Sequence, residues 1–212
     1  MIEIFDIEQN TDAWKLARCG IPTASQFKTV LASGKGGGES VGRRKYLYQL
    51  AGEIVSGIPM ESYGNGFMDR GHRMEEELRN YYAFLADAEP ERVGFIRNGQ
   101  KGCSPDALLG SNGLLEIKSH APHLLIDLLF KDEFPPEHKP QTQGQLLVAE
   151  REFIDIICGY TGMPPLVKRA YRDSFYIKKL SDAIDQFNDE LAETVERIKR
   201  YSPSIPALEH AA

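Results

Sequence analysis

Two short apolar runs on either side of a glycine-rich turn predict a β-hairpin within residues 103–120. The turn, Gly110-Ser111-Asn112-Gly113, contains an Asn-Gly pair with a flanking glycine, and these residues supply the positive φ angles that tight hairpin turns need. Successive side chains of a strand point to opposite faces, so Glu116 and Lys118 are expected on one face of the second strand. Asp106 enters from the first strand. The pattern therefore predicts that two carboxylates and one ammonium meet at one end of a two-stranded ribbon.

Elsewhere, apolar residues recur every three or four positions, which is typical of helices with one buried face. The clearest repeat is Met74, Leu78, Tyr81 and Leu85. It predicts a helix from Asp69 to Ala86, and Glu75 falls beside the stripe as either a solvated acid or a ligand. Similar patterns predict helices over residues 43–56, 140–149 and 181–201, with an irregular tail after Pro203.

Three other apolar stretches are predicted to be strands. Residues 91–98 alternate and are expected to pair with the hairpin, residues 152–160 read as a buried strand, and residues 175–177 as a further one. Because 212 residues can bury a substantial core and no interdomain linker is visible, a single domain spanning residues 1–212 is expected.

A further helix start is predicted at Thr23, because Gln26 follows three residues later as in a capping box. Free N–H groups and nearby hydroxyls at such a start favour anions, and Arg18 could add a bidentate fork for a phosphate. A plain helix cap beside a surface arginine explains the same spacing. From spacing alone, that second interpretation is the better one.

Composition is that of an ordinary globular protein, with 42% hydrophobic and 26% charged residues. No apolar run is long enough for a transmembrane helix, no signal-peptide pattern is present, and the three scattered cysteines suggest reduced thiols, so a cytoplasmic location is expected. The net charge of −6 would repel a polyanion unless basic residues are focused into a groove. Residues 43–45 and 168–172 are basic clusters that could do this, or they could be solvated surface.

The acids of the hairpin suit a hard cation. Mg²⁺ is commonly bound by one or two carboxylates, and a cation held by Asp106 and Glu116 could polarise a phosphodiester and activate water. Lys118 could orient that water or stabilise developing negative charge. The alternative is an exposed hairpin with solvated acids. His120 and His123 could suggest zinc, but no cysteine lies nearby and a proline intervenes, so a polar rim is expected.

Four motifs, in order along the chain, resemble those of one nuclease family. They are Trp14 with Arg18-x-Gly20-x-x-Thr23-Ala24-Ser25, then Gly71-x-x-x-Glu75, then Cys103-Ser104-Pro105-Asp106 with Glu116-x-Lys118, and last Gln141-Thr142-Gln143. The third is similar to the PD-(D/E)xK nuclease signature. Together they resemble the phage lambda exonuclease branch, also called YqaJ-type viral recombinases.

This resemblance implies an α/β fold with a mixed central β-sheet flanked by helices, as in restriction endonucleases. It implies a metal-dependent deoxyribonuclease that degrades one strand of double-stranded DNA from 5′ to 3′ in phage-type recombination. Mg²⁺ would be the cofactor, two ions per site, with Mn²⁺ as a substitute. A ring-shaped homotrimer and a single-strand annealing partner protein are also implied.

The resemblance also assigns roles by position. Asp106, Glu116, Glu75 and the backbone carbonyl of Ile117 would hold metal; Lys118 and Gln143 would act with them in catalysis; Arg18, Thr23 and Ser25 would bind the 5′-phosphate; and Met68 would be a wedge at the DNA end. Two alternatives remain at this stage: an endonuclease of the same fold, of restriction or junction-resolving type, and a non-catalytic DNA-recombination scaffold.

Overall fold

The computed structural model describes residues 1–38, 40–60 and 66–203, with backbone alone for residue 35 and residues 66–73. The elements in chain order are β1 (Ile2–Phe5), α1 (Asp12–Arg18), η1 (Ala24–Gln26), α2 (Phe27–Val30), η2 (Lys35–Gly37), α3 (Val41–Ser56), α4 (Gly66–Ala86), β2 (Phe95–Asn98), β3 (Lys101–Cys103), β4 (Ala107–Leu109), β5 (Gly113–Ser119), α5 (Pro122–Lys131), η3 (Pro136–His138), α6 (Lys139–Ala149), β6 (Phe153–Gly159), β7 (Leu166–Tyr171) and α7 (Ser174–Lys199).

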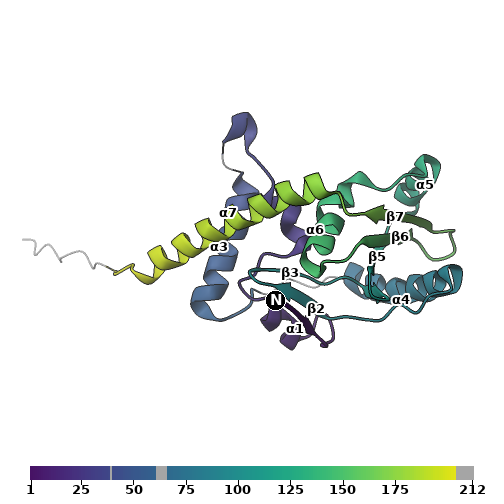
Figure 1. Ribbon diagram of the computed structural model, residues 1–212, viewed down its shortest axis with the longest axis horizontal. Coiled ribbons are helices and arrows are strands. Elements are labelled where there is room, and N and C mark those ends of the chain that lie inside the picture. The colour runs from purple at the N-terminus through teal and green to yellow at the C-terminus, as the bar shows by residue number, and fades with distance from the viewer. Residues whose placement is uncertain (39, 61–65, 204–212) are drawn as a thin grey trace, which may run out of the picture.

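The fold is mixed α/β, as expected, but its strands divide between two sheets (Figure 1). One sheet has the order β1-β2-β3 and is antiparallel throughout; the other has the order β4-β5-β6-β7, with β5 and β6 parallel. The prediction that residues 91–98 pair with the hairpin is wrong. Strand β2 pairs with β1 and β3, and only Glu91 reaches the hairpin, through a bridge to Leu108.

The predicted hairpin is confirmed, with Ala107 opposite Leu115 and Leu109 opposite Gly113. Its turn differs in detail from the expectation, because the positive φ angle occurs at Gly110 (54°) and not at the Asn-Gly pair. Gly113 is needed for another reason. A Cβ atom there would lie 2.3 Å from the Cζ atom of Phe153 on the neighbouring strand, so a larger residue would have to displace the Phe153 ring.

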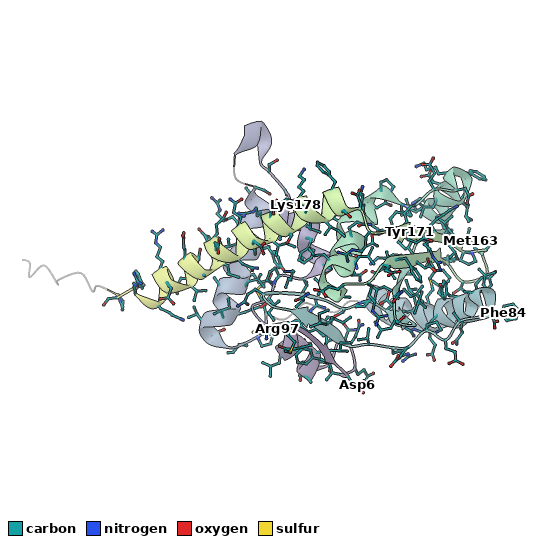
Figure 2. The ribbon with its side chains drawn as sticks, viewed as in Figure 1. Asp6, Phe84, Arg97, Met163, Tyr171 and Lys178 are labelled. Atoms are coloured by element: carbon teal, nitrogen blue, oxygen red, sulfur yellow. The ribbon has the colours of Figure 1, made fainter. Side chains whose placement is uncertain are left out.

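Helix α4 covers one face of the four-stranded sheet, where it packs against Leu115 and Ile117. Its buried residues are Met74, Leu78 and Tyr82, whereas Tyr81 and Leu85 are about half exposed at 47% and 57%. The predicted stripe is therefore wrong at its C-terminal half. At roughly 100° per residue, the buried arc is rotated toward Glu75 and Arg79, which brings both to the edge of the core. Phe84 points away from the sheet (Figure 2).

The opposite face of this sheet is covered by α5 and α6, and α7 lies across α3 and α6 before it extends past them (Figure 1). Helix α7 begins at Ser174, where the Asp173 side chain accepts a hydrogen bond from the Tyr176 N–H (3.0 Å). The predicted strand at residues 175–177 is therefore wrong, and the C-terminal helix starts seven residues before the expected position 181. The tail expected after Pro203 lies outside the described residues. No described helix has the length and apolarity that a membrane crossing requires.

Candidate active site

Asp106 is held by the strand that carries the other two hairpin site residues. Its backbone N–H donates to the Leu115 carbonyl (3.0 Å), and its Oδ2 atom accepts a hydrogen bond from the Ile117 N–H (2.5 Å). The pKa of Asp106 is raised well above its ordinary value, first by burial and then by the negative charges of Glu116 and Glu75. Three acids therefore share one electrostatic environment, and a bound cation would relieve their repulsion.

Glu116 and Lys118 form an ion pair on the opposite face of β5 from Leu115 and Ile117. Glu116 is 3% exposed, and its Oε1 atom lies 2.6 Å from Lys118 Nζ. Burial acts to lower the pKa of Lys118, but the charge and hydrogen bond of Glu116 outweigh burial and the pKa is raised. Lys118 is thus an ammonium at neutral pH, able to donate hydrogen bonds and balance negative charge, but not to accept a proton.

Two glutamines of α6 complete the surroundings of Glu116. Gln141 Nε2 donates to Glu116 Oε1 (2.5 Å), and Gln145 Nε2 donates to Glu116 Oε2 (2.6 Å). Gln143, which was predicted to face this site, points elsewhere: its amide donates to the Tyr171 carbonyl (2.9 Å) and accepts from the Asp173 N–H (2.8 Å). The reason is helical periodicity, because residues four apart share a face and a residue between them does not. We therefore move the supporting role from Gln143 to Gln141 and Gln145.

The three glutamines give a matched set of variants on one helix. We expect Gln141→Leu and Gln145→Leu to lower kcat by roughly 10- to 100-fold, as is usual for groups that orient a ligand. Gln143→Leu is expected to leave kcat unchanged but to cost about 1–3 kcal/mol of stability, since two backbone groups lose their partner. Turnover on linear duplex DNA and chemical denaturation separate the two outcomes. A larger loss of kcat in Gln143→Leu than in Gln141→Leu would contradict this assignment.

Glu75 approaches from α4 and is paired with an arginine that the sequence motifs do not include. Arg79 Nη2 lies 2.5 Å from Glu75 Oε1 and 3.4 Å from the Asp106 carbonyl. Glu75, Arg79 and Asp106 line one cavity of about 680 Å³. The spacing of four residues between Glu75 and Arg79, with opposite charges, was the available signal for this pair.

The hard carboxylate oxygens of this site fit a divalent cation such as Mg²⁺. The structural observation in favour is the donor set itself, since Asp106 lies near two further acids. Burial first, and then the charges of Glu116 and Glu75, raise the pKa of Asp106. Within the described residues, however, the ligand atoms of Asp106, Glu116 and Glu75 do not gather within 4.8 Å of one another as a set. Glu75 and Glu116 are turned toward Arg79 and Lys118, so these side chains have to rearrange when a cation binds.

All the assigned roles remain predictions, and for two of them the structure gives no geometry. The backbone N–H of Ile117 contacts Asp106, while the proposed role of its carbonyl as a metal ligand has no contact that bears on it. Met68 lies in the first turn of α4, among the residues whose side chains the structure does not describe.

Arg18, Thr23 and Ser25 meet at a second cavity, of about 430 Å³. Arg18 Nη2 donates to Thr23 Oγ1 (3.3 Å), and this hydroxyl lies 3.3 Å from Ser25 Oγ. The predicted capping box is wrong, since the Thr23 side chain caps no backbone N–H and a short 3₁₀ turn precedes α2. The Thr23 hydroxyl is instead turned toward the arginine. Lys45 and Tyr46 of α3 also line the cavity, and sequence reasoning noted Lys45 only as part of a basic cluster.

The cavity and the hairpin are physically connected. Thr23 forms a parallel bridge with Gly102, and the Gly102 N–H donates to the Pro22 carbonyl (3.1 Å). Four residues after Gly102 the chain reaches Asp106, at most roughly 14 Å away for a fully extended chain. Trp14 adds a second connection between the cavity and the hairpin. The Arg18 guanidinium lies over the Trp14 ring, 3.8 Å from its centroid, and the Nε1 atom of Trp14 donates a hydrogen bond to Ser104 Oγ (3.0 Å).

The two basic clusters have different surroundings. In residues 168–172, Lys168 pairs with Asp132 (2.8 Å), Arg169 pairs with Asp155 (2.7 Å), and Arg172 donates to the Leu146 carbonyl (2.6 Å). These contacts hold β7 against its neighbours, so this cluster is structural. In residues 43–45, Arg43 pairs with Glu190 of α7, and Lys45 opens onto the Arg18 cavity.

Comparison with known proteins places the chain in a family. Residues 13–152 match the YqaJ-like viral recombinase domain. The alkaline exonuclease LHK-Exo from Laribacter hongkongensis is 26% identical, with a TM-score of 0.79 over 90% of this chain and 97% of that one. Its structure in complex with dAMP is 27% identical, with a TM-score of 0.81 and the same coverage.

A phage-related exonuclease from Haemophilus somnus 129PT shares the fold, with a TM-score of 0.65 over 84% of this chain and 96% of that one, at 12% identity. No curated protein sequence matches the chain. The family match spans about two thirds of the 212 residues and contains all four motifs that carried the resemblance. The chain therefore belongs to the family of YqaJ-like viral recombinase domains.

Proposed function

We propose that the protein is a Mg²⁺-dependent exonuclease that degrades one strand of double-stranded DNA from its 5′ end. The observation that carries the proposal is the short path from an arginine-hydroxyl cavity to a group of acids with a partly buried lysine. A 5′-phosphate in the cavity would set the distance between the DNA end and the acids. The likeness to an alkaline exonuclease that also binds dAMP supports this choice.

In this proposal, each site residue has a defined task. Asp106, Glu116 and Glu75 would hold two Mg²⁺ ions, with Mn²⁺ as a substitute, and bound ions would supply Lewis-acid activation of water and of the scissile phosphate. The Lys118 ammonium donates hydrogen bonds to the attacking water or to the phosphate as negative charge develops. Gln141 and Gln145 fix the orientation of Glu116 through its two oxygens.

The arginine-hydroxyl cavity gives the protein its preference for DNA ends. The Arg18 guanidinium is held flat against Trp14 and can form paired hydrogen bonds with a phosphate, while Thr23 and Ser25 supply hydroxyl donors. Burial lowers the pKa of Arg18, and the nearby Tyr46, Cys103 and Glu53 counteract burial. An arginine nevertheless remains charged, so a partly buried cation faces the cavity.

Removal of Arg18 is expected to abolish the discrimination between DNA ends. Arg18→Ala should lower kcat/KM on 5′-phosphorylated duplex by roughly 100-fold and leave the slow reaction on 5′-hydroxyl duplex nearly unchanged, because a charge-assisted bidentate contact contributes about 3 kcal/mol. Arg97→Ala on β2 (Figure 2) is the control, since its Nε donates to the Gly99 carbonyl outside the cavity. Equal rates on both ends in the wild type would contradict the cavity's role.

Assembly is part of the same proposal. A homotrimeric ring, with basic cavities facing a central channel, would reconcile the net charge of −6 with a polyanionic substrate. A single-strand annealing protein would then take up the strand that degradation leaves behind. Light scattering at several protein concentrations measures the stoichiometry, and a monomer at all of them would contradict the ring.

The position of a label on linear DNA tests the function directly. With Mg²⁺, duplex labelled at the 5′ end should release labelled mononucleotide at once, whereas duplex labelled at the 3′ end of the same strand should release it only late. A covalently closed circular duplex should remain intact. Cleavage of the circle would favour an endonuclease of the same fold, and early release of the 3′ label would reverse the polarity.

A further inference from the structure

Three side chains with metal-ligating atoms meet where β5 ends and α6 begins. His120 follows the last residue of β5, and Glu137 and His138 lie in η3 directly before α6. One ligand atom from each of the three lies within 4.8 Å of the other two, and within the described parts of the chain no other set of three does so. The group is separate from Asp106, Glu116 and Glu75, and sequence reasoning had treated His120 as part of a polar rim.

His138 has a buried ring nitrogen without a hydrogen bond to the part of the chain that the structure describes. This atom is Nε2, and buried ring nitrogens usually have a partner. The residue is held in place by its backbone, since its N–H donates to the Pro135 carbonyl (3.1 Å) and its carbonyl accepts from Thr142 Oγ1 (3.0 Å). The His138 ring also meets the His120 ring edge to face, with centroids 6.0 Å apart. Two neighbouring imidazoles, one of them with a buried nitrogen free of contacts to the described residues, offer two nitrogen ligands for a metal ion.

His120 has the outer contact that histidine ligands usually make. Its Nδ1 atom lies 3.4 Å from the Lys118 carbonyl, which leaves Nε2 as the ligand atom. Histidines that bind metal commonly donate their other ring N–H to a backbone carbonyl or a carboxylate, which fixes the tautomer and the orientation of the ring. His123, three residues away on α5, is exposed and is outside the group.

We propose that His120, Glu137 and His138 form a second cation site, for a borderline transition metal of the Zn²⁺ class. Two imidazoles and one carboxylate suit Zn²⁺, whereas Mg²⁺ prefers oxygen ligands. Ligands about 2.1 Å from a tetrahedral zinc lie roughly 3.4 Å apart. The three ligand atoms lie within 4.8 Å of one another, so no pair has to close by more than about 1.4 Å. Exposed Glu137 can turn freely to do this. Water fills the fourth position.

Such an ion would connect two elements of the candidate active site. It would join the end of β5, which carries Glu116 and Lys118, to the start of α6, which carries Gln141 and Gln145. Because the ion binds the folded chain and not the separated ligands of the unfolded chain, it stabilises the fold by mass action. At a hundredfold excess over Kd, the Tm should rise by about 5–10 °C. The site is independent of the proposed nuclease function.

Titration of the full-length protein with Zn²⁺, after chelator treatment, tests the site. Calorimetry should show one high-affinity Zn²⁺ per chain in the wild type, in His123→Ala and in Asp106→Asn. Glu137→Gln and His138→Ala should weaken binding at least roughly tenfold and a hundredfold, respectively, and remove the rise in Tm. Glu137 is exposed, so Glu137→Gln tests the ligand without threatening the fold.

Two results would overturn the proposal. Unchanged Zn²⁺ affinity in both Glu137→Gln and His138→Ala would show that these residues are not ligands. Loss of Zn²⁺ binding in Asp106→Asn, with normal binding in His138→Ala, would place the ion among the carboxylates instead. X-ray absorption of the Zn²⁺-loaded wild type adds a direct readout, because the site requires two imidazole ligands and the carboxylate centre supplies none.

Discussion

Asp106→Asn should abolish nuclease activity and at the same time make the metal-free protein more stable. We expect kcat/KM to fall by roughly 10³-fold or more, because the variant loses a ligand of a cation that contributes several kcal/mol to the transition state. The gain in stability follows from the raised pKa of Asp106, which means that its charged form is unfavourable in the fold. Asparagine keeps an oxygen to accept the Ile117 N–H but carries no charge.

The pH dependence of stability shows in which direction the Asp106 charge acts. The folded state holds the Asp106 proton to higher pH than the unfolded state does, so the unfolded state binds fewer protons above the ordinary aspartate pKa. Metal-free wild type should therefore lose stability as pH rises from the ordinary aspartate pKa toward the raised folded pKa. Asp106→Asn should lack that decrease. Denaturation in chelator at several pH values measures it, and a less stable Asp106→Asn at neutral pH would contradict the account.

Asp155 provides the matched control for this variant. It is also a buried aspartate, 4% exposed, on the strand next to β5, but its carboxylate is bound by Arg169 (2.7 Å) and Tyr82. Asp155→Asn should lose stability and keep its activity per folded molecule. The two variants should therefore change stability in opposite directions, and only Asp106→Asn should lose activity, which separates damage to the fold from loss of function.

Lys118→Met is expected to have the second largest effect. It should lower kcat by about 10²- to 10³-fold with little change in KM, because the ammonium acts on charge that develops in the transition state. It should also lower metal-free stability by about 1–3 kcal/mol, since Glu116 is left buried without its cation; the 27% exposure of Lys118 screens part of the pair. Mg²⁺ should restore part of this stability, because it brings positive charge back to Glu116.

Lys168→Met is the control for Lys118→Met, since Lys168 is equally exposed at 26% and is also paired with an acid, Asp132 (2.8 Å). Its removal should change stability slightly and leave kcat as it is. Single-turnover kinetics with saturating DNA separate the chemical step from binding. A loss of less than tenfold in kcat for Lys118→Met would remove this lysine from the chemistry.

The parts of the fold that local chemistry determines could be predicted from the sequence. The hairpin followed from its glycines and alternation, and α3 and α6 followed from periodicity and their end signals. The wrong predictions concern elements whose structure depends on packing between segments that are far apart in the sequence. The buried face of α4 is set by the sheet that it covers. Residues 175–177 are helical because α7 begins at Ser174, where the Asp173 side chain caps it.

In the candidate site, too, local spacing was predictable from the sequence, whereas contacts between different elements were not. The spacing of Asp106, Glu116 and Lys118 within one hairpin was visible in the sequence, since strand alternation determines which of them share a face. Motif resemblance selected Gln143, whereas the rotation of α6 against β5 turns Gln141 and Gln145 toward Glu116. Arg79 was missed although its spacing of four residues from Glu75 was visible, because it lies outside the motifs. His138 was missed because its ring partner, His120, comes from another element, and no local pattern indicates such a contact.

The central claim is that the Asp106 site degrades DNA from a 5′ end. The most direct measurement is the release of labelled mononucleotide from blunt linear duplex carrying a 5′-terminal labelled phosphate, with Mg²⁺, for wild type and Asp106→Asn side by side. The account predicts immediate release by the wild type and none above background by Asp106→Asn, although that variant is folded. Release by Asp106→Asn at the wild-type rate would contradict it.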